Sequence, residues 1–292
     1  MLLQEKEITE LERITDENDS RVRIFRLPEV QLLRYYEPEP GLFVCETPRV
    51  IERAIAAGYE PTAFLTEEDL LEKTAAPILA AYPDLPSYVV SHELMRRIAN
   101  CAMLRGMLCV MRRKRLPGLR EFLAALDCGS SGAGKSLAVM ENVINPTNIG
   151  AIFRAAAAMN VGGVLLTSGC SDPLYRRASR VSMGTVFGVP WTMPDRRFKW
   201  PAEGIRLLKE SGYTTLALAL KEDAVSILDI KRTENFKPAM ILGTEGDGLM
   251  KETIEACDQC VIIPMREGVD SLNVSAAAAV AFWEMTGRYG AE

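Results

Sequence analysis

The chain has little of several features that define large protein classes. It has one histidine, His92, and no uninterrupted apolar run that approaches the length needed to span a bilayer. Acidic residues enter at Glu5 and Glu7, before the apolar core of a signal peptide can form. These absences argue against an integral membrane protein and a secreted protein, so we expect a cytoplasmic location.

Cysteine usage excludes a second group of proteins. The seven cysteines are an odd number scattered along 292 residues, which is not the pattern of a disulfide framework. Cys257 and Cys260 form one Cys-x-x-Cys pair, a spacing that can bind zinc or carry redox chemistry. No second pair follows, and with a single histidine a four-ligand site would need distant cysteines. We therefore predict no metal site and interpret the pair as buried structural thiols.

Acidic residues outnumber basic ones, but the positive charge is concentrated in parts of the chain. A net charge of −5 speaks against nonspecific coating of nucleic acid, although the distribution of charge matters more than the total. Between Arg96 and Arg120 there are eight basic residues and no acidic one. This stretch and a smaller downstream cluster are candidates for phosphate contact, with a solvated basic face as the alternative. The candidates are Arg112, Arg113, Lys114, Arg115, Arg176, Arg177 and Arg180.

The apolar pattern predicts two α/β domains. A chain with 48% hydrophobic and 25% charged residues is globular, and its length is nearer two domains than one. We predict an amino-terminal domain over residues 1–115, a linker over 116–136 and a second domain over 137–292. In the first domain we expect strands at 42–45, 62–65, 88–90 and 107–111, and helices at 30–36, 48–57, 67–73 and 93–99.

The second domain alternates more regularly. We expect strands at 137–140, 163–167, 185–190, 214–220, 239–242 and 260–263, and helices at 149–159, 175–181, 203–210, 250–256 and 274–285. Strands separated by helices predict a parallel sheet covered on both faces.

The predicted linker contains a match to the P-loop pattern, GSSGAGKS at residues 129–136. A working P-loop needs a buried strand before it and a helix that starts at Lys135, because loop amides and the helix amino terminus hold the phosphates. Here a helix is expected before the loop, near residues 120–126, and a strand after it. We interpret the match as a flexible linker.

Three motifs in the second domain lie where strands end or helices begin. They are NIGAIFR at residues 148–154, GTEGDGL at 243–249, and IPM at 263–265 followed by SLNVS at 271–275. The glycine-rich motif follows a predicted strand, so its glycines would let the backbone approach a ligand at the carboxyl edge of the sheet. An ordinary tight turn is the alternative. By periodicity alone, Asn148 and Asn273 are explained as helix caps and Arg154 as a surface residue.

Together, in this order and spacing, these motifs resemble the signature motifs of the SpoU/TrmH branch of the SPOUT RNA methyltransferases. The resemblance covers residues 137–287, and residues 41–111 resemble the ribosomal-protein-like RNA-binding domain of many rRNA-modifying members. It implies S-adenosylmethionine-dependent methylation of a ribose 2′-hydroxyl in RNA, with rRNA favoured over tRNA. It also implies a deep trefoil knot, which periodicity alone would never suggest, and a homodimer formed through the second domain.

The resemblance assigns roles by position. The ribose and phosphate chemistry falls to Asn148, Arg154, Glu245, Ser271 and Asn273. The cofactor contacts fall to Leu218, Ala219, Leu220, Gly243, Glu245, Gly246, Ile263, Met265, Leu272 and Ser275. A guanidinium is a poor base, with a pKa above about 12. We therefore expect Arg154 to bind a phosphate and stabilise the developing alkoxide, with a phosphate or Glu245 accepting the proton.

Three other interpretations stay open on the sequence. They are a tRNA 2′-O-methyltransferase, a non-catalytic RNA-binding or ribosome-assembly protein, and a P-loop NTPase. Cofactor binding together with methylated RNA would separate an enzyme from an assembly protein. Nucleotide binding that depends on Lys135 would indicate the NTPase.

Overall fold

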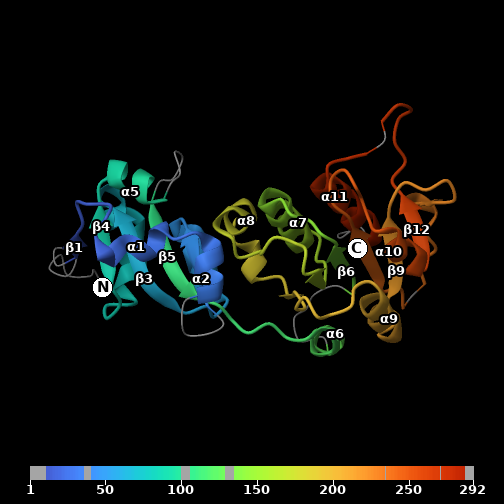
Figure 1. Cartoon of the computed structure of the whole chain (residues 1–292), viewed down its shortest axis with the longest axis horizontal. Helices are drawn as coiled ribbons and strands as arrows, with labels where there is room; N and C mark the ends of the chain where they lie inside the picture. Colours follow the sequence, from blue (N-terminus) through green and yellow to red (C-terminus); the bar gives the residue numbers. More distant parts are fainter. Residues whose placement is uncertain are drawn as a thin grey trace, which may run out of the picture. The chain divides into compact units, whose positions relative to one another are not determined.

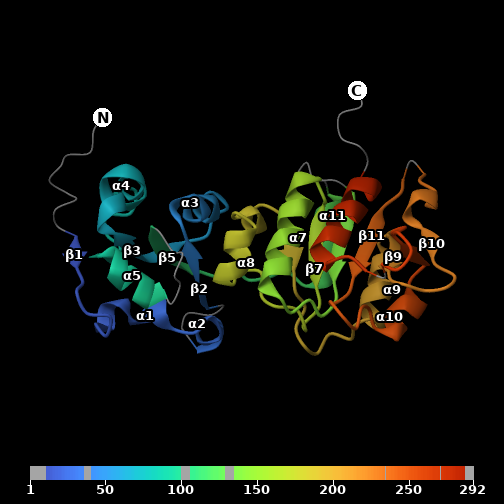
Figure 2. The ribbon, with the colours of Figure 1, turned by 90° about the horizontal axis from the view of Figure 1, so that it is seen from above.

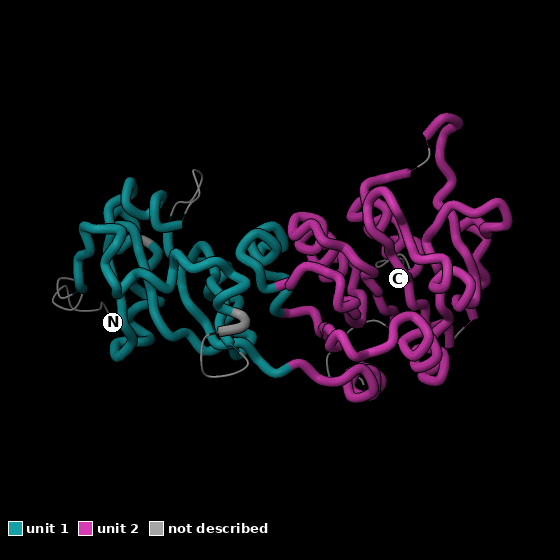
Figure 3. Tube along the Cα trace, viewed as in Figure 1, with its two compact units in different colours: residues 1–115, 174–187 teal, residues 116–173, 188–292 magenta. Residues whose placement is uncertain are grey.

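The chain divides into two units, which are described separately. The computed structural model describes residues 11–35, 41–99, 106–128, 135–233, 235–269 and 271–286. Unit 1 comprises Met1–Arg115 and Leu174–Phe187, and unit 2 comprises Leu116–Pro173 and Gly188–Glu292 (Figure 3). The predicted linker therefore belongs to unit 2, and a segment assigned to the second domain belongs to unit 1.

Unit 1 is built on a five-stranded mixed sheet with the order β1-β4-β3-β5-β2. Strand β5 is antiparallel to both β2 and β3, whereas β4 is parallel to β3 and β1. The strands are β1 (Glu12–Arg13), β2 (Leu42–Glu46), β3 (Pro61–Glu67), β4 (Ser87–Val90) and β5 (Met107–Arg112). The strands predicted in this domain are confirmed.

Helices surround this sheet. The α-helices are α1 (Arg23–Arg26), α2 (Glu29–Tyr35), α3 (Pro48–Ala56), α4 (Ala76–Ala80), α5 (His92–Ala99) and α8 (Arg176–Val181). Short 3-10 helices lie at Ser20–Val22, Glu68–Leu70 and Thr185–Phe187, and a π-helical turn lies at Leu71–Ala75. The helix predicted at 67–73 is thus a 3-10 turn followed by a π turn. The Ser91 hydroxyl caps α5, accepting from the Leu94 amide at 3.3 Å.

Helix α8 belongs to unit 1 because a buried carboxylate holds it there. The Glu46 side chain, only 3% exposed at the end of β2, accepts from Arg176 Nε at 2.9 Å and from Arg180 Nη1 at 2.9 Å. A buried carboxylate is costly unless cations and hydrogen bonds compensate it. Two guanidinium groups on one α8 turn meet that requirement.

One predicted strand is wrong. Residues 185–190 were expected to be extended, but Thr185–Phe187 is a 3-10 helix and the strand begins later, as β8 (Trp191–Thr192). The Phe187 ring is buried against Phe43 and Tyr59, with centroids 5.9 and 5.2 Å away. Burial among rings of unit 1 produces the same apolar pattern as burial in a sheet.

Unit 2 is built on a seven-stranded sheet with the order β10-β12-β9-β11-β6-β7-β8, and every pairing is parallel. The parallel sheet predicted for this domain is confirmed. Besides β8, the strands are β6 (Leu137–Met140), β7 (Gly163–Leu166), β9 (Thr214–Leu218), β10 (Val225–Ser226), β11 (Pro238–Leu242) and β12 (Gln259–Ile262).

Helices cover both faces of this sheet. They are α6 (Leu119–Asp127), α7 (Pro146–Ala158), α9 (Ala202–Glu210), α10 (Lys251–Ala256) and α11 (Val274–Met285), with a 3-10 turn at Ile227–Asp229. Helices α7 and α11 pack side by side on one face (Figure 2), and α6 and α9 lie on the other (Figure 1). Side chains alternate between the faces, so Val139 and Ile241 join Phe122 and Leu208 in one apolar cluster.

The context of the P-loop match is as predicted. Residues 129–134 lie outside the described part of the chain. Helix α6 ends before them at Asp127, and strand β6 begins after them at Leu137. No helix starts at Lys135 to hold a phosphate, so the match lacks the structural context of a P-loop. Within the described ranges, no helix has the length and apolar character needed to cross a membrane.

The Glu46 cluster leads to a stability prediction. Glu46→Ala leaves two arginines, one of them largely buried, without their carboxylate, so the free energy of unfolding should fall by about 3 kcal/mol. Urea denaturation followed by circular dichroism measures the change. The control is Glu60→Ala in the same unit, which removes an exposed ion pair to Arg112 at 3.6 Å and should cost less than about 1 kcal/mol. Equal losses in the two variants would contradict the assigned role of Glu46.

Candidate functional site

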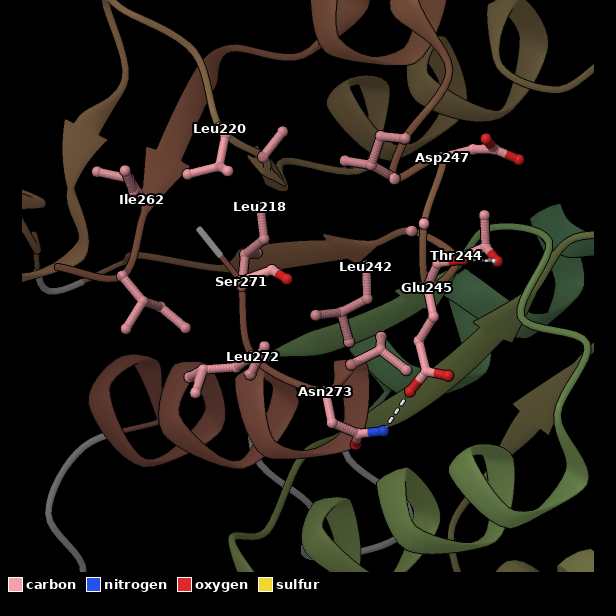
Figure 4. Close-up of a pocket in the computed structure, with 18 of the residues that line it drawn as sticks. Leu218, Leu220, Leu242, Thr244, Glu245, Asp247, Ile262, Ser271, Leu272 and Asn273 are labelled. Atoms are coloured by element: carbon pink, nitrogen blue, oxygen red, sulfur yellow. Dashed lines mark hydrogen bonds between the residues drawn. The ribbon is translucent and has the colours of Figure 1, made fainter. Parts of the chain in front are cut away.

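A cavity of about 590 Å³ lies at the carboxyl edge of the unit 2 sheet. The ends of β9, β11 and β12 form its base, and the segment that leads into α11 closes one side (Figure 4). Parallel strands bring their carboxyl ends to one edge, which is where open α/β sheets bind ligands. The lining residues include Leu218, Ala219, Leu220, Gly243, Glu245, Gly246, Ile263, Met265, Ser271, Leu272 and Asn273.

Most of the predicted cofactor residues therefore lie together. Of that set, Ser275 is the exception, because it does not line the cavity. Its hydroxyl instead donates to Asn273 Oδ1 at 2.6 Å. Ser275 thus holds the side chain of Asn273, which lines the cavity.

The glycine-rich motif forms a closed turn that needs its glycines. Thr244 and Gly248 exchange two backbone hydrogen bonds of 3.2 Å, so the turn closes on itself. A Cβ atom on Gly243 would lie 2.3 Å from the carbonyl carbon of Gly248, which no side chain can satisfy. Gly246 has φ 99° and Gly248 has φ 69°, conformations that L-residues rarely adopt. The turn is therefore more specialised than an ordinary connection before a helix.

Three polar side chains from the three motifs form a connected chain of hydrogen bonds. Asn273 Nδ2 donates to Asn148 Oδ1 at 3.2 Å and also to Glu245 Oε1. Figure 4 shows Glu245 pointing from the glycine turn toward Asn273. Residues more than a hundred positions apart in the sequence thus meet at one rim.

Asn273 is both a helix cap and a residue of the site, two roles that the sequence left as alternatives. Its Oδ1 accepts from the Ser275 amide at 2.9 Å and so caps α11. Its Nδ2 makes the two bonds to the site described above. An amide side chain offers both an acceptor and donors, so one residue can serve both functions.

Asn148 is not a helix cap, and that alternative is wrong. Helix α7 begins three residues earlier than predicted, with Pro146 at its first turn and Asn145 as the cap, whose Oδ1 accepts from the Thr147 amide at 2.9 Å. Asn148 is 5% exposed and faces Asn273. Proline fits the first helical position because it lacks an amide hydrogen that would otherwise be unpaired.

Arg154 lies away from the cavity in the single chain. It is exposed on α7, does not line the cavity, and makes no ion pair or hydrogen bond with the described residues. The structure therefore joins Asn148, Glu245, Ser271 and Asn273 in one site and leaves Arg154 facing solvent.

The predicted RNA-binding residues separate into two groups. Arg176 and Arg180 are paired with Glu46, Lys114 lies 4.7 Å from the centre of the Tyr59 ring, and Arg113 is half-buried. Arg112, Arg115 and Arg177 are exposed. The internal contacts give several of these side chains a structural role besides any contact with RNA.

Cys257 and Cys260 are partly buried, whereas the sequence predicted buried thiols. Burial raises the pKa of Cys257 to about 12 and raises the pKa of Cys260, because a thiolate is poorly solvated inside the protein. Among the described residues, no group of three or more histidines, cysteines or carboxylates could hold a metal ion.

One residue of this region was missed. Glu141, 1% exposed, directly follows β6 and accepts from the Met250 amide, next to the glycine turn. A carboxylate at the end of a short apolar strand is the signal that could have found it.

Comparison with known proteins agrees with this geometry. The profile of the SpoU rRNA Methylase family matches residues 135–283. A protein of Mycobacterium tuberculosis H37Rv described as an uncharacterised tRNA/rRNA methyltransferase is 33% identical over 279 residues, covering 95% of this chain and 92% of that protein. The 23S rRNA (guanosine-2′-O-)-methyltransferase RlmB of Escherichia coli K12 is 32% identical over 166 residues, covering 57% of this chain and 63% of that protein.

Solved structures share the fold over nearly the whole chain. The AdoMet-bound rRNA methyltransferase of Sinorhizobium meliloti has a TM-score of 0.73 at 21% identity and covers 94% of this chain and 97% of its own. An RNA 2′-O ribose methyltransferase has a TM-score of 0.71 at 24% identity, with 93% and 97% coverage. These structures therefore share the fold of this chain, and the family itself is shown by the profile match and by the M. tuberculosis relative. The chain belongs to the SpoU family of RNA methyltransferases.

The raised thiol pKa values lead to a reactivity prediction. Alkylation needs the thiolate, and at pH 8 a thiol with a pKa of about 12 is almost entirely protonated. Iodoacetamide should therefore modify the exposed Cys128 at least ~tenfold faster than Cys257 in the folded protein. Peptide mass spectrometry over a time course measures both rates. Equal rates would contradict the raised pKa of Cys257.

Proposed function

We propose that the protein transfers a methyl group from S-adenosylmethionine to a ribose 2′-hydroxyl of rRNA. The observation that carries the proposal is the hydrogen-bonded chain Asn148–Asn273–Glu245 at the rim of an apolar cavity built from three strand ends. Family membership supports RNA methylation, and the E. coli relative is a 23S rRNA ribose methyltransferase by its description.

The cavity fits S-adenosylmethionine in size and lining. Its volume of about 590 Å³ falls in the range of small-molecule sites, which are mostly apolar with a few placed polar groups. Leu218, Leu242 and Ile262 supply apolar walls, and Gly243 lets backbone approach the ligand closely. When bound there, the sulfonium cofactor would supply an activated methyl group.

The polar rim would orient the ribose. Asn273 and Glu245 present an amide and a carboxylate, and Ser271 adds a hydroxyl on the same wall. Positioning an oxygen nucleophile supplies much of the rate in such a transfer. Glu245 or an RNA phosphate takes the hydroxyl proton, because a carboxylate or phosphate can serve as a base at neutral pH whereas a guanidinium cannot.

Arg154 completes the proposal as the phosphate-binding residue. It is exposed on α7 and has no partner among the residues that the structure describes, so its guanidinium is available to a polyanion. A homodimer through unit 2 is part of the proposal, because α11 leaves Val280 41% exposed and Trp283 52% exposed on a helix that packs beside α7. A second copy is the occupant that would cover them.

The trefoil knot and the rRNA preference belong to the same proposal. After β12 the chain returns past Glu245 and packs α11 against α7, which is the path that a threaded segment would take. Unit 1 gives the enzyme a second body with exposed basic residues such as Arg115 and Arg177, which supports a large structured RNA as substrate.

The proposed function is tested by incubating the protein with methyl-labelled S-adenosylmethionine and separate pools of unmodified rRNA and tRNA. Nucleoside analysis should show labelled 2′-O-methylribose from rRNA. Label confined to a base would refute the reaction, and label confined to tRNA would refute the substrate. Absence of transfer to either pool, with cofactor bound, would favour a non-catalytic RNA-binding protein.

Replacing Arg154 separates catalysis from cofactor binding. Arg154→Ala should lower kcat at least ~100-fold, because the RNA loses the cation proposed to hold its phosphate and so to position the reacting ribose. The dissociation constant for S-adenosylmethionine, measured by calorimetry, should stay within about twofold because Arg154 does not line the cavity. Arg206→Ala, which removes another exposed arginine of unit 2, is the control and should keep full activity. Wild-type turnover by Arg154→Ala would refute the assignment.

Two substitutions of Asn273 separate its cap from its site role. Asn273→Ser keeps a side chain that caps α11 but loses the amide that bonds Glu245 and Asn148. Asn273→Ala loses both functions and should unfold at a lower temperature than Asn273→Ser. Initial rates should fall at least ~tenfold in both variants. Full activity in Asn273→Ser would show that Asn273 acts only as a helix cap.

The dimer is tested through the exposed face of α11. Light scattering coupled to size exclusion should give twice the mass of one chain for the wild type. Trp283→Arg should give the mass of a single chain, because a charge in an apolar interface is costly to bury. A monomeric wild type would refute the dimer.

A further inference from the structure

Glu141 is a buried carboxylate beside the cavity that takes no part in lining it. It is 1% exposed and follows the last residue of β6. Its backbone amide donates to the Leu242 carbonyl at 2.8 Å, which extends the pairing of β6 with β11 to the residue that immediately precedes the glycine turn. The main chain of Glu141 therefore fixes where the turn begins.

The side chain of Glu141 fixes where the turn ends. Its Oε1 accepts from the Met250 amide at 2.6 Å, and Met250 immediately follows the turn at residues 243–249. Met250 is also the amino-terminal cap position of α10 and has no side-chain cap of its own. The carboxylate of Glu141 thus accepts from the amide of the cap residue of α10, as the N3 carboxylate does in a capping box, but from another part of the sequence.

The second oxygen of Glu141 anchors the carboxylate itself. Oε2 accepts from the Thr253 hydroxyl and from the Trp200 indole nitrogen. Among the described residues no lysine, arginine or histidine forms an ion pair with Glu141. A buried carboxylate without a cation is stable only when its oxygens are fully hydrogen-bonded, so these donors define one position for it.

We propose that Glu141 is the positioning residue of the cofactor site, holding both ends of the glycine turn so that Gly243 and Glu245 are in place before the ligand binds. The inference rests on the proposed function, because the turn is where S-adenosylmethionine would bind. Preorganised sites bind more tightly because less ordering is required on binding. Glu141 acts through Met250 and Leu242 and touches neither substrate nor cofactor.

The test compares a substitution of the Glu141 carboxylate with a substitution of Trp200, which donates to its Oε2 atom. Glu141→Gln keeps the shape but replaces one oxygen by an NH₂ group, which meets a donor whichever way the amide turns. Its dissociation constant for S-adenosylmethionine, measured by calorimetry on the full chain, should rise at least ~tenfold. Trp200→Phe removes one of the two donors to Oε2. Because the Thr253 hydroxyl and the Met250 amide still hold the carboxylate, the constant should change less than ~twofold.

A second variant removes the same bond from the other side. Met250→Pro deletes the amide hydrogen that Oε1 accepts, at a residue whose φ of −60° suits proline. It should weaken cofactor binding as Glu141→Gln does, while binding of rRNA in the absence of cofactor stays unchanged. If Glu141→Gln does not fold, the cofactor affinity of Met250→Pro tests the positioning role of Glu141 instead.

The outcomes separate this inference from the proposed function. If the wild type neither binds S-adenosylmethionine nor methylates RNA, the proposed function fails. If the wild type does both, a folded Glu141→Gln with unchanged cofactor affinity overturns the positioning role alone. An equal loss of affinity in Trp200→Phe also overturns it, because the effect would then be general destabilisation.

Discussion

The amide of Asn273 is the interaction on which the site of this protein depends. One side of the amide caps α11, and the other side bonds Glu245 on the glycine turn and Asn148 on α7. Serine and aspartate cap helices about as well, but neither offers an N–H group to two further acceptors. The helix that closes the cavity and the residues at its rim are thus fixed by the same side chain.

The arrangement works because the sheet of unit 2 is parallel and its strand order is not the chain order. Strand β9 lies between β11 and β12, so the loops that follow these three strands meet at one edge of the sheet. Glycines then let the middle loop close on itself at Gly243. Glu141 holds the two flanks of that loop from a fourth strand. The cavity is a product of this convergence.

The basic residues of the two predicted clusters do not all face solvent. The basic clusters suggested a surface for RNA, yet Arg176 and Arg180 neutralise the buried Glu46 and hold α8 on unit 1. A run of arginines in a sequence shows where cations are concentrated. It does not show which carboxylates they will pair with after folding. Arg115 and Arg177 keep their exposure and are the better candidates for phosphate contact.

Hydrophobic periodicity determined the α/β class, the parallel sheet and most elements, because burial on one or both faces leaves a local pattern. The resemblance to the SpoU/TrmH family, which the motifs carry, also pointed to the strand-end residues that line the cavity. Periodicity misplaced residues 185–190, because the burial of Phe187 against aromatic rings looks the same in sequence as a strand. Only the tertiary structure decided that Asn145 and not Asn148 caps α7, that Glu46 pairs with α8, and that Glu141 spans the glycine turn. Each of these depends on which distant side chain satisfies a buried polar group, and a local pattern carries no record of that partner.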